Sequence, residues 1–510
     1  MNNVNAYSKD LSVQSFAIEA GKLIAVLNEP DAKELGLLPL ERVLVTNPKN
    51  KRNTICVVDV SKKKLIENAH IGLFQDVTDV LDVKQGDKVN VAPVGKPKSL
   101  EFIKKKIEGK ELTKEELKAI VSDIDKNMLS DIEASAFMTA VFINGYTLNE
   151  TVNMTKALTE NGLRVHIEKE PVVDKHSIGG INGRATMLIV PIVAAAGLYM
   201  PKTSSRSITS SAGTADSMEV LCNVNLTGDQ IKNITEKVGG VICWGGALDL
   251  APVDDKIIKI EHPLSLDPEG QVIASVMAKK SSVSAKFLVI DIPVGPGMKI
   301  KDKEKGKRIA NNFISVGKLL GLKVESVLTD GVQPSGPAFG PALETKNAME
   351  ILEGKVYNNL AQKACELAGV LMELSGKAEK GKGFKEAKEI LSSGKALAKM
   401  KEIIAAQGGR ADSSDKIKID SLTEKFKAVE EGEISFIDVK RLIEATRIAG
   451  CPNDINAGLL LNIEVGQKIK SEDLLFTVYS SNKRKLDLAK KFLEEHEVLK
   501  FERVILEKFI

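Results

Sequence analysis

DKHSIGG at residues 174–180 and SSRSITSSAGTADSME at residues 204–219 are the most informative stretches of this 510-residue chain. Both combine hydroxyl and charged side chains with closely spaced glycine and alanine. Lys175 offers a positive charge, Ser177 offers a hydroxyl, and the glycine pair 179–180 lets bare backbone N–H groups approach an anion. This mixture indicates a binding site for one or more phosphate groups.

Residues 163–415, which contain both motifs, alternate short apolar strands with helical patterns, as α/β units do. The clearest strand candidates are residues 238–242, 287–292 and 323–329. Glycines follow several of them, which is typical of ligand-binding loops at strand ends. We therefore expect a central α/β phosphate-binding domain over residues 163–415.

The segment before this domain has the pattern of a helical subdomain. Serine or threonine is followed three residues later by glutamate in three successive capping-box patterns: Thr113/Glu116, Ser130/Glu133 and Thr147/Glu150. Each pattern opens a stretch with apolar residues at helical spacing. We expect helices over residues 96–162, and we expect part of residues 252–284 to return to this subdomain.

The two ends of the chain are richer in β patterns. Residues 1–95 contain short β-branched or alternating runs separated by proline and glycine, at 23–27, 42–46, 54–60 and 88–92. These runs predict a β-barrel-like module. Residues 416–510 predict a C-terminal α+β domain that is rich in strands. The expected fold class is a multidomain α/β protein with a β module at its N-terminus.

Composition and charge exclude several classes of function. The 72 basic and 69 acidic residues give a net charge of +3, which is too even to indicate a nucleic-acid or membrane surface. Lysine runs at 62–64 and 104–106 are expected to be solvated. The start MNNVNAYSKD lacks the pattern of a signal peptide. The apolar run 187–198 contains Pro191 and is too short to span a bilayer.

The cysteines indicate neither a disulfide framework nor a zinc site. The five residues are scattered along the chain: Cys56, Cys222, Cys243, Cys365 and Cys451. No Cys-x-x-Cys or Cys/His spacing appears among them. Reduced thiols fit a cytoplasmic protein. Because no acidic cluster with metal-ligand spacing stands out either, we expect no bound metal.

The two motifs resemble the signature of the thymidine/pyrimidine nucleoside phosphorylase family. In that family a Lys-x-Ser loop with a glycine pair and a Ser-x-Arg…Gly-Thr-x-Asp segment build the phosphate site. Three further segments fit the family in the same order: LAPVD at 250–254, ASVMAKK at 274–280 and DGVQP at 330–334. The N-terminal β module is similar to the additional domain of archaeal AMP phosphorylases, the nucleoside 5′-monophosphate branch of this family.

This resemblance implies a central domain of the nucleoside phosphorylase type II fold and a phosphorolysis reaction. The implied substrate is AMP, with CMP and UMP as further candidates, and the products are the free base and ribose 1,5-bisphosphate. Such a reaction serves nucleotide degradation and salvage. The resemblance implies no cofactor, with inorganic phosphate as co-substrate. It also implies self-association into a dimer or larger homo-oligomer.

The resemblance assigns roles to residues of both motifs. The attacking phosphate would be bound by Lys175, Ser177, Ser204 and Thr214. The nucleotide would be bound by Gly179, Ser205, Arg206, Ser207, Ile208, Thr209, Ser210, Thr214, Ser275 and Lys299. His176 and Lys279 would border the base or the sugar. Arg206 has an alternative role, an internal ion pair with Asp216 or Glu219.

Asp267 matches the proton donor proposed for AMP phosphorylases. Its place between the apolar residues 264–266 and the candidate base-site Ser275 predicts partial desolvation. Desolvation would raise the pKa of the carboxyl group and keep it protonated, so that it could protonate the departing base. The alternative role is a turn cap before Pro268, which aspartate commonly provides.

One departure from the pyrimidine enzymes argues against a pyrimidine site of the usual design and favours a larger base. Those enzymes hold the base carbonyl with an arginine, whereas this chain has Ile260 at the matching position. Isoleucine cannot donate a hydrogen bond, and a buried carbonyl left unsatisfied costs about 1–3 kcal/mol. Three alternatives stay open: a pyrimidine nucleoside (thymidine) phosphorylase, a phosphoribosyltransferase of the anthranilate type, and a non-catalytic adaptor that retains the fold.

Overall fold

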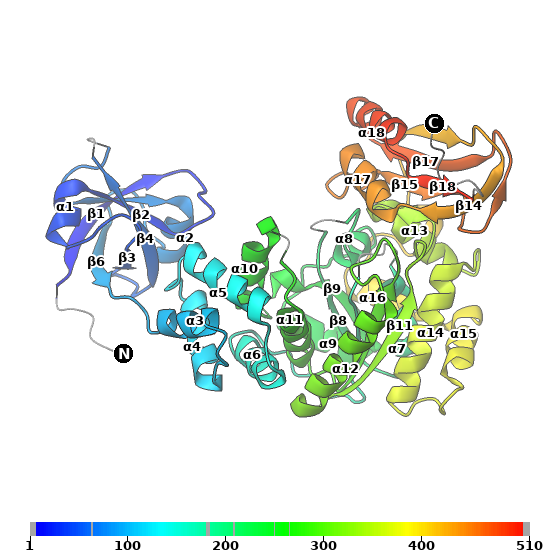
Figure 1. Cartoon of the computed structure of the whole chain (residues 1–510), viewed down its shortest axis with the longest axis horizontal. Coiled ribbons are helices and arrows are strands. Elements are labelled where there is room, and N and C mark those ends of the chain that lie inside the picture. Colours follow the sequence, from blue (N-terminus) through cyan, green and yellow to red (C-terminus); the bar gives the residue numbers. More distant parts are fainter. Residues whose placement is uncertain are drawn as a thin grey trace, which may run out of the picture. The chain divides into compact units, whose positions relative to one another are not determined.

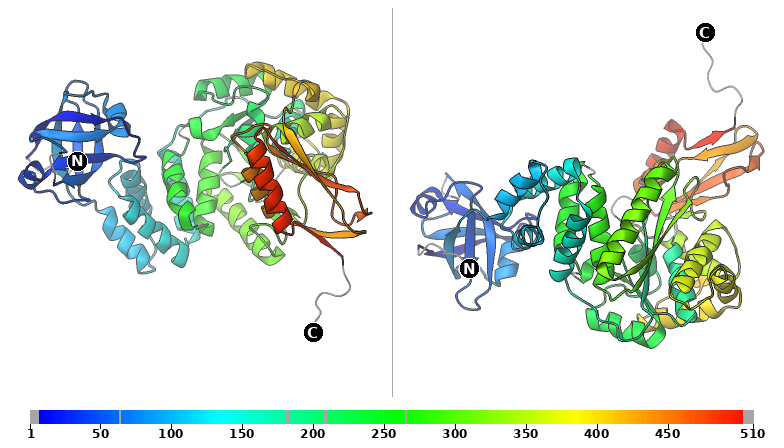
Figure 2. Two further views of the ribbon diagram at one scale, coloured as in Figure 1. Left: turned by 90° about the horizontal axis from the view of Figure 1, so that it is seen from above. Right: turned by 60° about the horizontal axis from the view of Figure 1, so that its bottom comes forward.

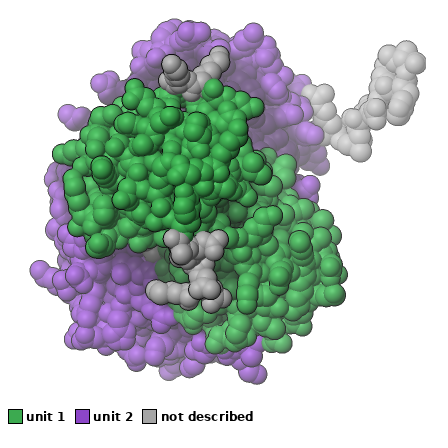
Figure 3. All heavy atoms as spheres, turned by 90° about the vertical axis from the view of Figure 1, so that its left-hand side faces the viewer, with its two compact units in different colours: residues 1–161, 251–275 green, residues 162–250, 276–510 purple. Residues whose placement is uncertain are grey.

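The computed structural model describes residues 7–62, 65–179, 184–207, 210–248, 250–264 and 266–502. The chain divides into two compact units, which Figure 3 colours separately. Unit 1 comprises residues 1–161 and 251–275, and unit 2 comprises residues 162–250 and 276–510. The segment that returns to the helical part is therefore 251–275, and helix α11 (Glu269–Ser281) contributes residues to both units.

Unit 1 begins with a closed six-stranded barrel, drawn in blue in Figure 1. Its strands follow the order β1-β5-β2-β4-β3-β6 around the barrel, so each has two neighbours and no edge is left open. Alternating side chains point inward, as in β4, where Thr54, Cys56 and Val58 are buried. The elements are β1 Lys9–Phe16, β2 Ile24–Asn28, α1 Glu29–Glu34, β3 Arg42–Thr46, β4 Asn53–Ser61, β5 His70–Phe74, α2 Gln75–Leu81 and β6 Lys88–Val94.

The rest of unit 1 is helical. All three predicted capping boxes are confirmed, at the N-termini of α4, α5 and α6. In each box the serine or threonine accepts from the third helical N–H and the glutamate accepts from the cap N–H, which satisfies two donors that would otherwise lack partners. Helix α10 packs against α4, α5 and α6. The helices are α3 Ser99–Ile107, α4 Lys114–Asp125, α5 Asp131–Asn144, α6 Leu148–Glu160 and α10 Pro252–Glu261.

One lysine of the run 104–106 contradicts the expectation of a solvated face. Lys106 is only 3% exposed, and its Nζ lies 2.7 Å from Oε1 of the fully buried Glu150. Glu150 also accepts from the backbone N–H of Leu112 and Thr147. The single carboxylate therefore joins α3 to the N-terminus of α6, and the expectation of a solvated lysine at this position is wrong.

Five parallel strands form the centre of unit 2. Strands β11, β10 and β7 make one sheet in that order, and β8 pairs with β9. A parallel bridge between Val172 and Tyr199, with a 2.9 Å hydrogen bond from Val173 N to Tyr199 O, joins the start of β7 to the start of β8. The strands are β7 Val173–Ser177, β8 Met200–Ser204, β9 Gly240–Trp244, β10 Phe287–Val294 and β11 Lys323–Asp330.

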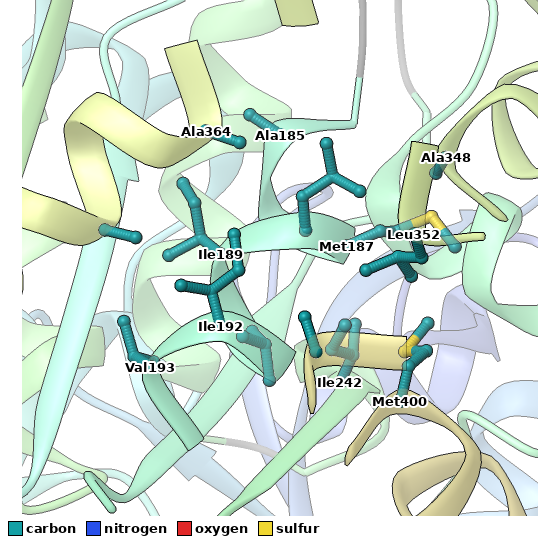
Figure 4. Close-up of a cluster of buried hydrophobic side chains, with 14 of the residues drawn as sticks. Ala185, Met187, Ile189, Ile192, Val193, Ile242, Ala348, Leu352, Ala364 and Met400 are labelled. Carbon is teal, nitrogen blue, oxygen red and sulfur yellow. The ribbon is translucent and has the colours of Figure 1, made fainter. Parts of the chain in front are cut away.

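The core of unit 2 is built around α7 (Ala185–Ala195), whose ten residues from Ala185 to Ala194 are all buried. Figure 4 shows Met187, Ile189 and Ile192 of this helix among side chains of β9, α13, α14 and α16. A helix that is apolar on every side is stable only when enclosed. The helices of this central part of unit 2 also include α8 Thr214–Glu219, α9 Gly228–Val238, α12 Lys303–Leu320, α13 Pro341–Leu352, α14 Asn359–Leu374, α15 Gly383–Ser392 and α16 Lys395–Ala406.

The C-terminal part of unit 2 combines an antiparallel sheet, β12-β15-β17-β13, with a second one, β16-β14-β18. Strand β12 comes from the central part of the chain, so the first sheet is completed by a distant segment. Helix α18 packs along β17 and β13 (Figure 2). The elements are β12 Ala338–Phe339, β13 Leu422–Lys427, β14 Gly432–Ile437, α17 Val439–Ala449, β15 Gly458–Leu461, β16 Lys468–Ile469, β17 Leu474–Ser480, α18 Lys483–Glu495 and β18 Leu499–Phe501.

All five cysteines are buried and none forms a disulfide. They lie in different elements or loops of the two units. None of the helices in the described part of the chain has both the length and the apolar character needed to cross a membrane.

Candidate phosphate site

The candidate phosphate residues lie at the carboxyl ends of neighbouring parallel strands. Ser177 is the last residue of β7 and Ser204 is the last residue of β8. Because all five central strands run in the same direction, their carboxyl ends meet at one edge, where ligands of open α/β sheets bind. Lys175 lies within β7, although its sequence motif indicates a glycine loop there. Gly180 lies outside the described residues.

Asp291, in β10, is the centre of one cluster of contacts at this edge. Its Oδ2 accepts from Ser177 Oγ at 2.8 Å and lies 3.6 Å from Lys175 Nζ and 3.2 Å from Lys363 Nζ. Its Oδ1 accepts from Thr329 Oγ1 at 2.5 Å. Lys363 also donates to Thr329 Oγ1 at 3.1 Å. Two of the predicted phosphate ligands, Lys175 and Ser177, are therefore held by one carboxylate.

The pKa values of Lys175 and Asp291 are both lowered in this cluster, for different reasons. Burial lowers the pKa of the Lys175 ammonium from its usual value, although Asp291 acts to raise it. Burial alone would raise the pKa of Asp291, but the charges of Lys175 and Lys363 outweigh it and the pKa is lowered. Asp291 is thus a stable anion, and it stabilises the protonated form of Lys175.

Asp174 is the centre of a second buried cluster. It directly precedes Lys175, a member of the first cluster, in β7. Its two carboxylate oxygens lie 3.2 Å from Lys202 Nζ and 2.8 Å from Lys280 Nζ. Lys202 also donates to the backbone carbonyl of Lys175 at 2.7 Å. Burial, together with the charge of Lys280, lowers the pKa of Lys202 despite the opposing effect of Asp174. Asp174 therefore holds the backbone of Lys175 in place through Lys202.

His176 lies between Lys175 and Ser177 in β7. Burial lowers the pKa of its imidazole well below the usual value, and the charges of Lys280 and Lys202 lower it further. The ring is therefore neutral near pH 7. A neutral imidazole can donate from one nitrogen and accept at the other, which suits a contact with sugar or base.

The second motif forms a loop between β8 and α8 that is held by its own side chains. Arg206 donates to both oxygens of Glu219, at 2.6 and 2.8 Å, and to Asp216 at 3.2 Å. Its guanidinium also lies over the Trp244 ring, 4.8 Å from the ring centroid. This is the internal ion pair named as the alternative for Arg206, and a role of Arg206 on an anion stays a prediction.

Asp216 and Gly213 fix the close approach of the loop to helix α8. Asp216 accepts from the backbone N–H of Ser207 and of Gly213, both at 2.8 Å. A Cβ atom added to Gly213 would lie 2.4 Å from the carbonyl oxygen of Ser205. Glycine is therefore required where the loop folds back, directly before Thr214, the first residue of α8.

A buried ion pair holds the C-terminal part of this loop, residues 210–212. Arg184 Nε lies 2.5 Å from Glu344 Oε2, and Arg184 Nη2 donates to the carbonyl of Ala212. Ser211 Oγ donates to Glu344 at 3.1 Å. Arg447, from α17, donates to the carbonyl of Ser210 at 3.1 Å. The loop is thus anchored to three distant parts of unit 2.

The remaining candidates of the second motif lie on the loop itself. Ser205 is exposed, and Ser207 and Ser210 are partly buried. The hydroxyl groups of Ser207 and Ser210 donate to backbone carbonyls of the loop, at 2.5 and 2.8 Å. Ile208 and Thr209 lie outside the described residues. Gly179 is partly buried and directly follows Ile178, whose N–H donates to the backbone oxygen of Asp291.

Asp267 and Ser275 belong to unit 1. Asp267 is exposed, so the partial desolvation expected from its apolar neighbours is not found in the structure. The flanking Leu264 is itself 72% exposed, which explains why the apolar sequence around Asp267 does not enclose it. Ser275 Oγ donates to Asp254 Oδ2 at 2.6 Å. Lys279, partly buried, and Lys299, exposed, belong to unit 2.

Sequence reasoning missed most partners of the predicted ligands. Asp291, Thr329 and Lys363 come from three elements far from the motifs in sequence. Asp291 sits inside the apolar run FLVIDIPV of β10, and a lone acidic residue in a buried strand is a signal that could have been used. Within the described part of the chain, no group of three or more His, Cys, Asp and Glu side chains is arranged to hold a metal ion.

Two family models match the helical part of unit 1 and the central α/β part of unit 2. The helical bundle domain of the glycosyl transferase family matches residues 100–162, and the α/β domain of that family matches residues 169–397. The AMP phosphorylase of Methanococcoides burtonii is 44% identical over 501 residues, which cover 98% of both chains. This chain belongs to the AMP phosphorylase family.

Other AMP phosphorylases agree with this assignment. The AMP phosphorylase of Thermococcus kodakarensis is 43% identical over 492 residues, covering 96% of this chain and 97% of the relative. Among solved structures, the anthranilate phosphoribosyltransferase of Thermus thermophilus superposes with a TM-score of 0.53 at 18% identity, covering 60% of this chain and 99% of that one. The likeness to that enzyme concerns the fold alone. The expected helical subdomain and α/β domain are confirmed.

Proposed function

We propose that this protein phosphorolyses AMP, with inorganic phosphate as co-substrate and with adenine and ribose 1,5-bisphosphate as products. The observation that carries the proposal is the 44% identity to an AMP phosphorylase over 98% of both chains. Because the relative from Thermococcus kodakarensis is also an AMP phosphorylase, the pyrimidine nucleoside reaction is less favoured. CMP and UMP are further candidate substrates.

Phosphorolysis replaces the bond from C1′ to the base nitrogen with a bond from C1′ to a phosphate oxygen. The reaction needs a positioned phosphate, an environment that tolerates positive charge at the sugar, and a proton for the departing base. Positioning and electrostatic stabilisation supply most of the rate in such chemistry. The lysine-rich carboxyl edge of the unit 2 sheet supports phosphate binding there, with Lys175, Ser177, Ser204 and Thr214 as the proposed ligands.

The remaining roles follow from the family assignment and stay proposals. The loop 205–210 and Thr214, with Gly179, Ser275 and Lys299, would bind the nucleotide. Asp267 would donate the proton to the leaving base. His176, as a neutral imidazole, and Lys279 would border the base or the sugar. No cofactor takes part in this scheme.

The assembly and location of the protein also belong to the proposal. We expect self-association into a dimer or a larger homo-oligomer and no nucleic-acid partner. A cytoplasmic location is supported by five cysteines that are all unpaired thiols.

A substrate panel tests the proposed function. The purified protein is incubated with inorganic phosphate and with AMP, CMP, UMP, adenosine or thymidine, and the released base is quantified by liquid chromatography. We expect release of adenine from AMP and little release from adenosine, because the 5′-phosphate supplies part of the binding energy. Equal rates with AMP and adenosine, or a preference for thymidine, would replace this proposal with a nucleoside phosphorylase.

A further inference from the structure

Lys363 reaches the predicted phosphate ligands from a different part of the fold. It lies in the second turn of α14, and its ammonium lies 3.2 Å from Asp291 Oδ2. The same oxygen accepts from Ser177 and lies 3.6 Å from Lys175 Nζ. Three donors, two of them cations, therefore meet at one carboxylate oxygen.

The charges of this cluster do not balance. Lys175 and Lys363 share the single negative charge of Asp291, and both side chains are almost enclosed, with 6% and 12% exposed. The adjacent Asp174 is likewise shared by two buried lysines, Lys202 and Lys280. The Asp291 cluster thus holds two cationic side chains for one carboxylate. Buried charge without a partner is costly, so the arrangement favours the binding of an anion.

Lys363 also retains donor capacity in this arrangement. An ammonium group has three N–H donors. Among the described residues, the contacts of Lys363 are with Asp291 and with Thr329 Oγ1, at 3.2 and 3.1 Å, which use two of these donors. Thr329 is the last but one residue of β11, so the ammonium lies near the carboxyl edge, where Ser177 ends β7.

We propose that Lys363 binds the phosphate co-substrate together with Lys175 and Ser177, while Asp291 and Thr329 act as positioning residues that hold these donors together. This inference rests on the proposed function. The phosphate dianion would accept hydrogen bonds from donors that are already gathered at Asp291 before phosphate binds. Because the donors are already gathered, little reorganisation is needed when phosphate binds.

The test uses Lys363→Gln in the full chain. This variant is expected to fold, because Asp291 keeps Lys175, Ser177 and Thr329 as partners. Phosphate binding is measured by titration calorimetry with inorganic phosphate alone, and the KM values for phosphate and AMP are measured by base release. We expect Kd and KM for phosphate to rise at least tenfold, with KM for AMP changed less than twofold.

Two further variants separate binding from a structural role. Lys363→Arg keeps the positive charge and is expected to restore most of the phosphate affinity. Lys382→Gln is the matched control, because Lys382 is an exposed lysine whose ion pair is with the exposed Glu379, and it should leave every value unchanged. If Lys363→Gln gives no folded protein, Thr329→Val takes its place, and its Kd for phosphate should rise at least threefold.

The outcomes distinguish this inference from the proposed function. A phosphate Kd of Lys363→Gln, or of Thr329→Val in its place, that stays within twofold of wild type overturns the inference, whether or not AMP is cleaved. If wild type binds phosphate in a manner that depends on Lys363 but cleaves no AMP, the proposed function fails and the phosphate site stands. If wild type binds no phosphate, both fail.

Discussion

Ser177 has one hydroxyl hydrogen, and Asp291 accepts it at 2.8 Å. A bound phosphate must therefore compete with Asp291 for this donor or accept from it after rotation of the hydroxyl group. Either way, the serine contributes through a hydrogen bond to an anion, which is worth about 1.5–3 kcal/mol.

We predict that Ser177→Ala raises KM for phosphate about tenfold or more, because that bond is lost, while the protein stays folded. Initial rates at varied phosphate concentration measure this. Ser326→Ala is the control, since the Ser326 hydroxyl donates to the backbone carbonyl of Ala310. A phosphate KM equal to that of wild type would remove Ser177 from the site.

His176 gives a prediction about acid stability. Burial, Lys280 and Lys202 hold the pKa of the folded imidazole well below 6.5, the value expected in the unfolded chain. As pH falls below about 6.5, the unfolded chain binds a proton that the folded chain does not. The free energy of unfolding therefore falls with decreasing pH until the folded pKa is reached, by at most about 1.4 kcal/mol per pH unit.

His176→Asn should lack this contribution. We expect the difference in unfolding free energy between pH 7.5 and pH 5.5, measured by urea denaturation, to be smaller in the variant than in wild type. Nuclear magnetic resonance of histidine-labelled protein offers an independent check, because the His176 ring should not titrate between pH 6 and 7. Identical pH dependence in both proteins would contradict the neutral imidazole.

Asp267 carries the prediction about the chemical step. If it protonates the leaving base, Asp267→Asn should lower kcat by roughly 10²–10⁴-fold, as for other general acids, with little change in KM for AMP. Because Asp267 is exposed, the substitution should not affect folding. Glu304→Gln, another exposed acidic residue, serves as the control. A variant with near-normal turnover would leave Asp267 as a turn cap.

At the scale of elements, the loop between β8 and α8 depends on one glycine. Gly213→Ala would place a Cβ atom 2.4 Å from the Ser205 carbonyl oxygen, so the loop backbone has to move. We predict loss of most activity and a lower melting temperature. Gly95→Ala is the matched control, because its added Cβ would meet open space. A fully active Gly213→Ala protein would show that the loop does not need this conformation.

The same loop illustrates what sequence patterns can and cannot predict. Its hydroxyl-rich composition indicates an anion site, and the Arg206–Glu219 pair is an expected alternative, since both residues lie within one short segment. The anchors Arg184 and Arg447 are not predictable, because they reach the loop from distant elements. Capping boxes are predicted correctly, since they depend on residues only three positions apart.

Strand prediction fails where charged residues occupy buried strands. Strand β7 reads VDKHS, which has no apolar alternation, so its sequence predicts a loop. Asp174 and Lys175 are tolerated inside it because Lys202, Lys280 and Asp291 compensate their charges. Such compensation is a property of the tertiary structure, so no local pattern reports it. The run FLVIDIPV, by contrast, is predicted as a strand from its apolar residues.

At the scale of the whole molecule, the two units should respond differently to ligand. The Asp174 and Asp291 clusters lie in unit 2, so phosphate should stabilise that unit directly. At a concentration of 100 times its Kd, a ligand adds about 2.7 kcal/mol to the free energy of unfolding. We predict two calorimetric transitions. The transition temperature of unit 2 should rise when phosphate is added.

A variant in the barrel of unit 1 shows which calorimetric transition belongs to which unit. Ile71→Ala removes a fully buried side chain from the barrel core, which typically costs about 2–5 kcal/mol. It should lower only the transition temperature of unit 1 and leave the effect of phosphate on unit 2 unchanged. A single transition that moves as one with both perturbations would show that the units unfold cooperatively.

The buried cysteines make this chain a convenient host for site-specific labels. Burial raises the pKa of the Cys56, Cys222 and Cys243 thiols to about 12 and that of Cys365 to about 11, and it also raises the pKa of Cys451. Maleimides and iodoacetamides react with thiolates, which these side chains do not form near neutral pH. A cysteine introduced on the surface would therefore be the preferred target for a fluorophore or spin probe without removal of any native thiol. Storage without reductant should also be tolerated, because air oxidation proceeds through the same thiolate.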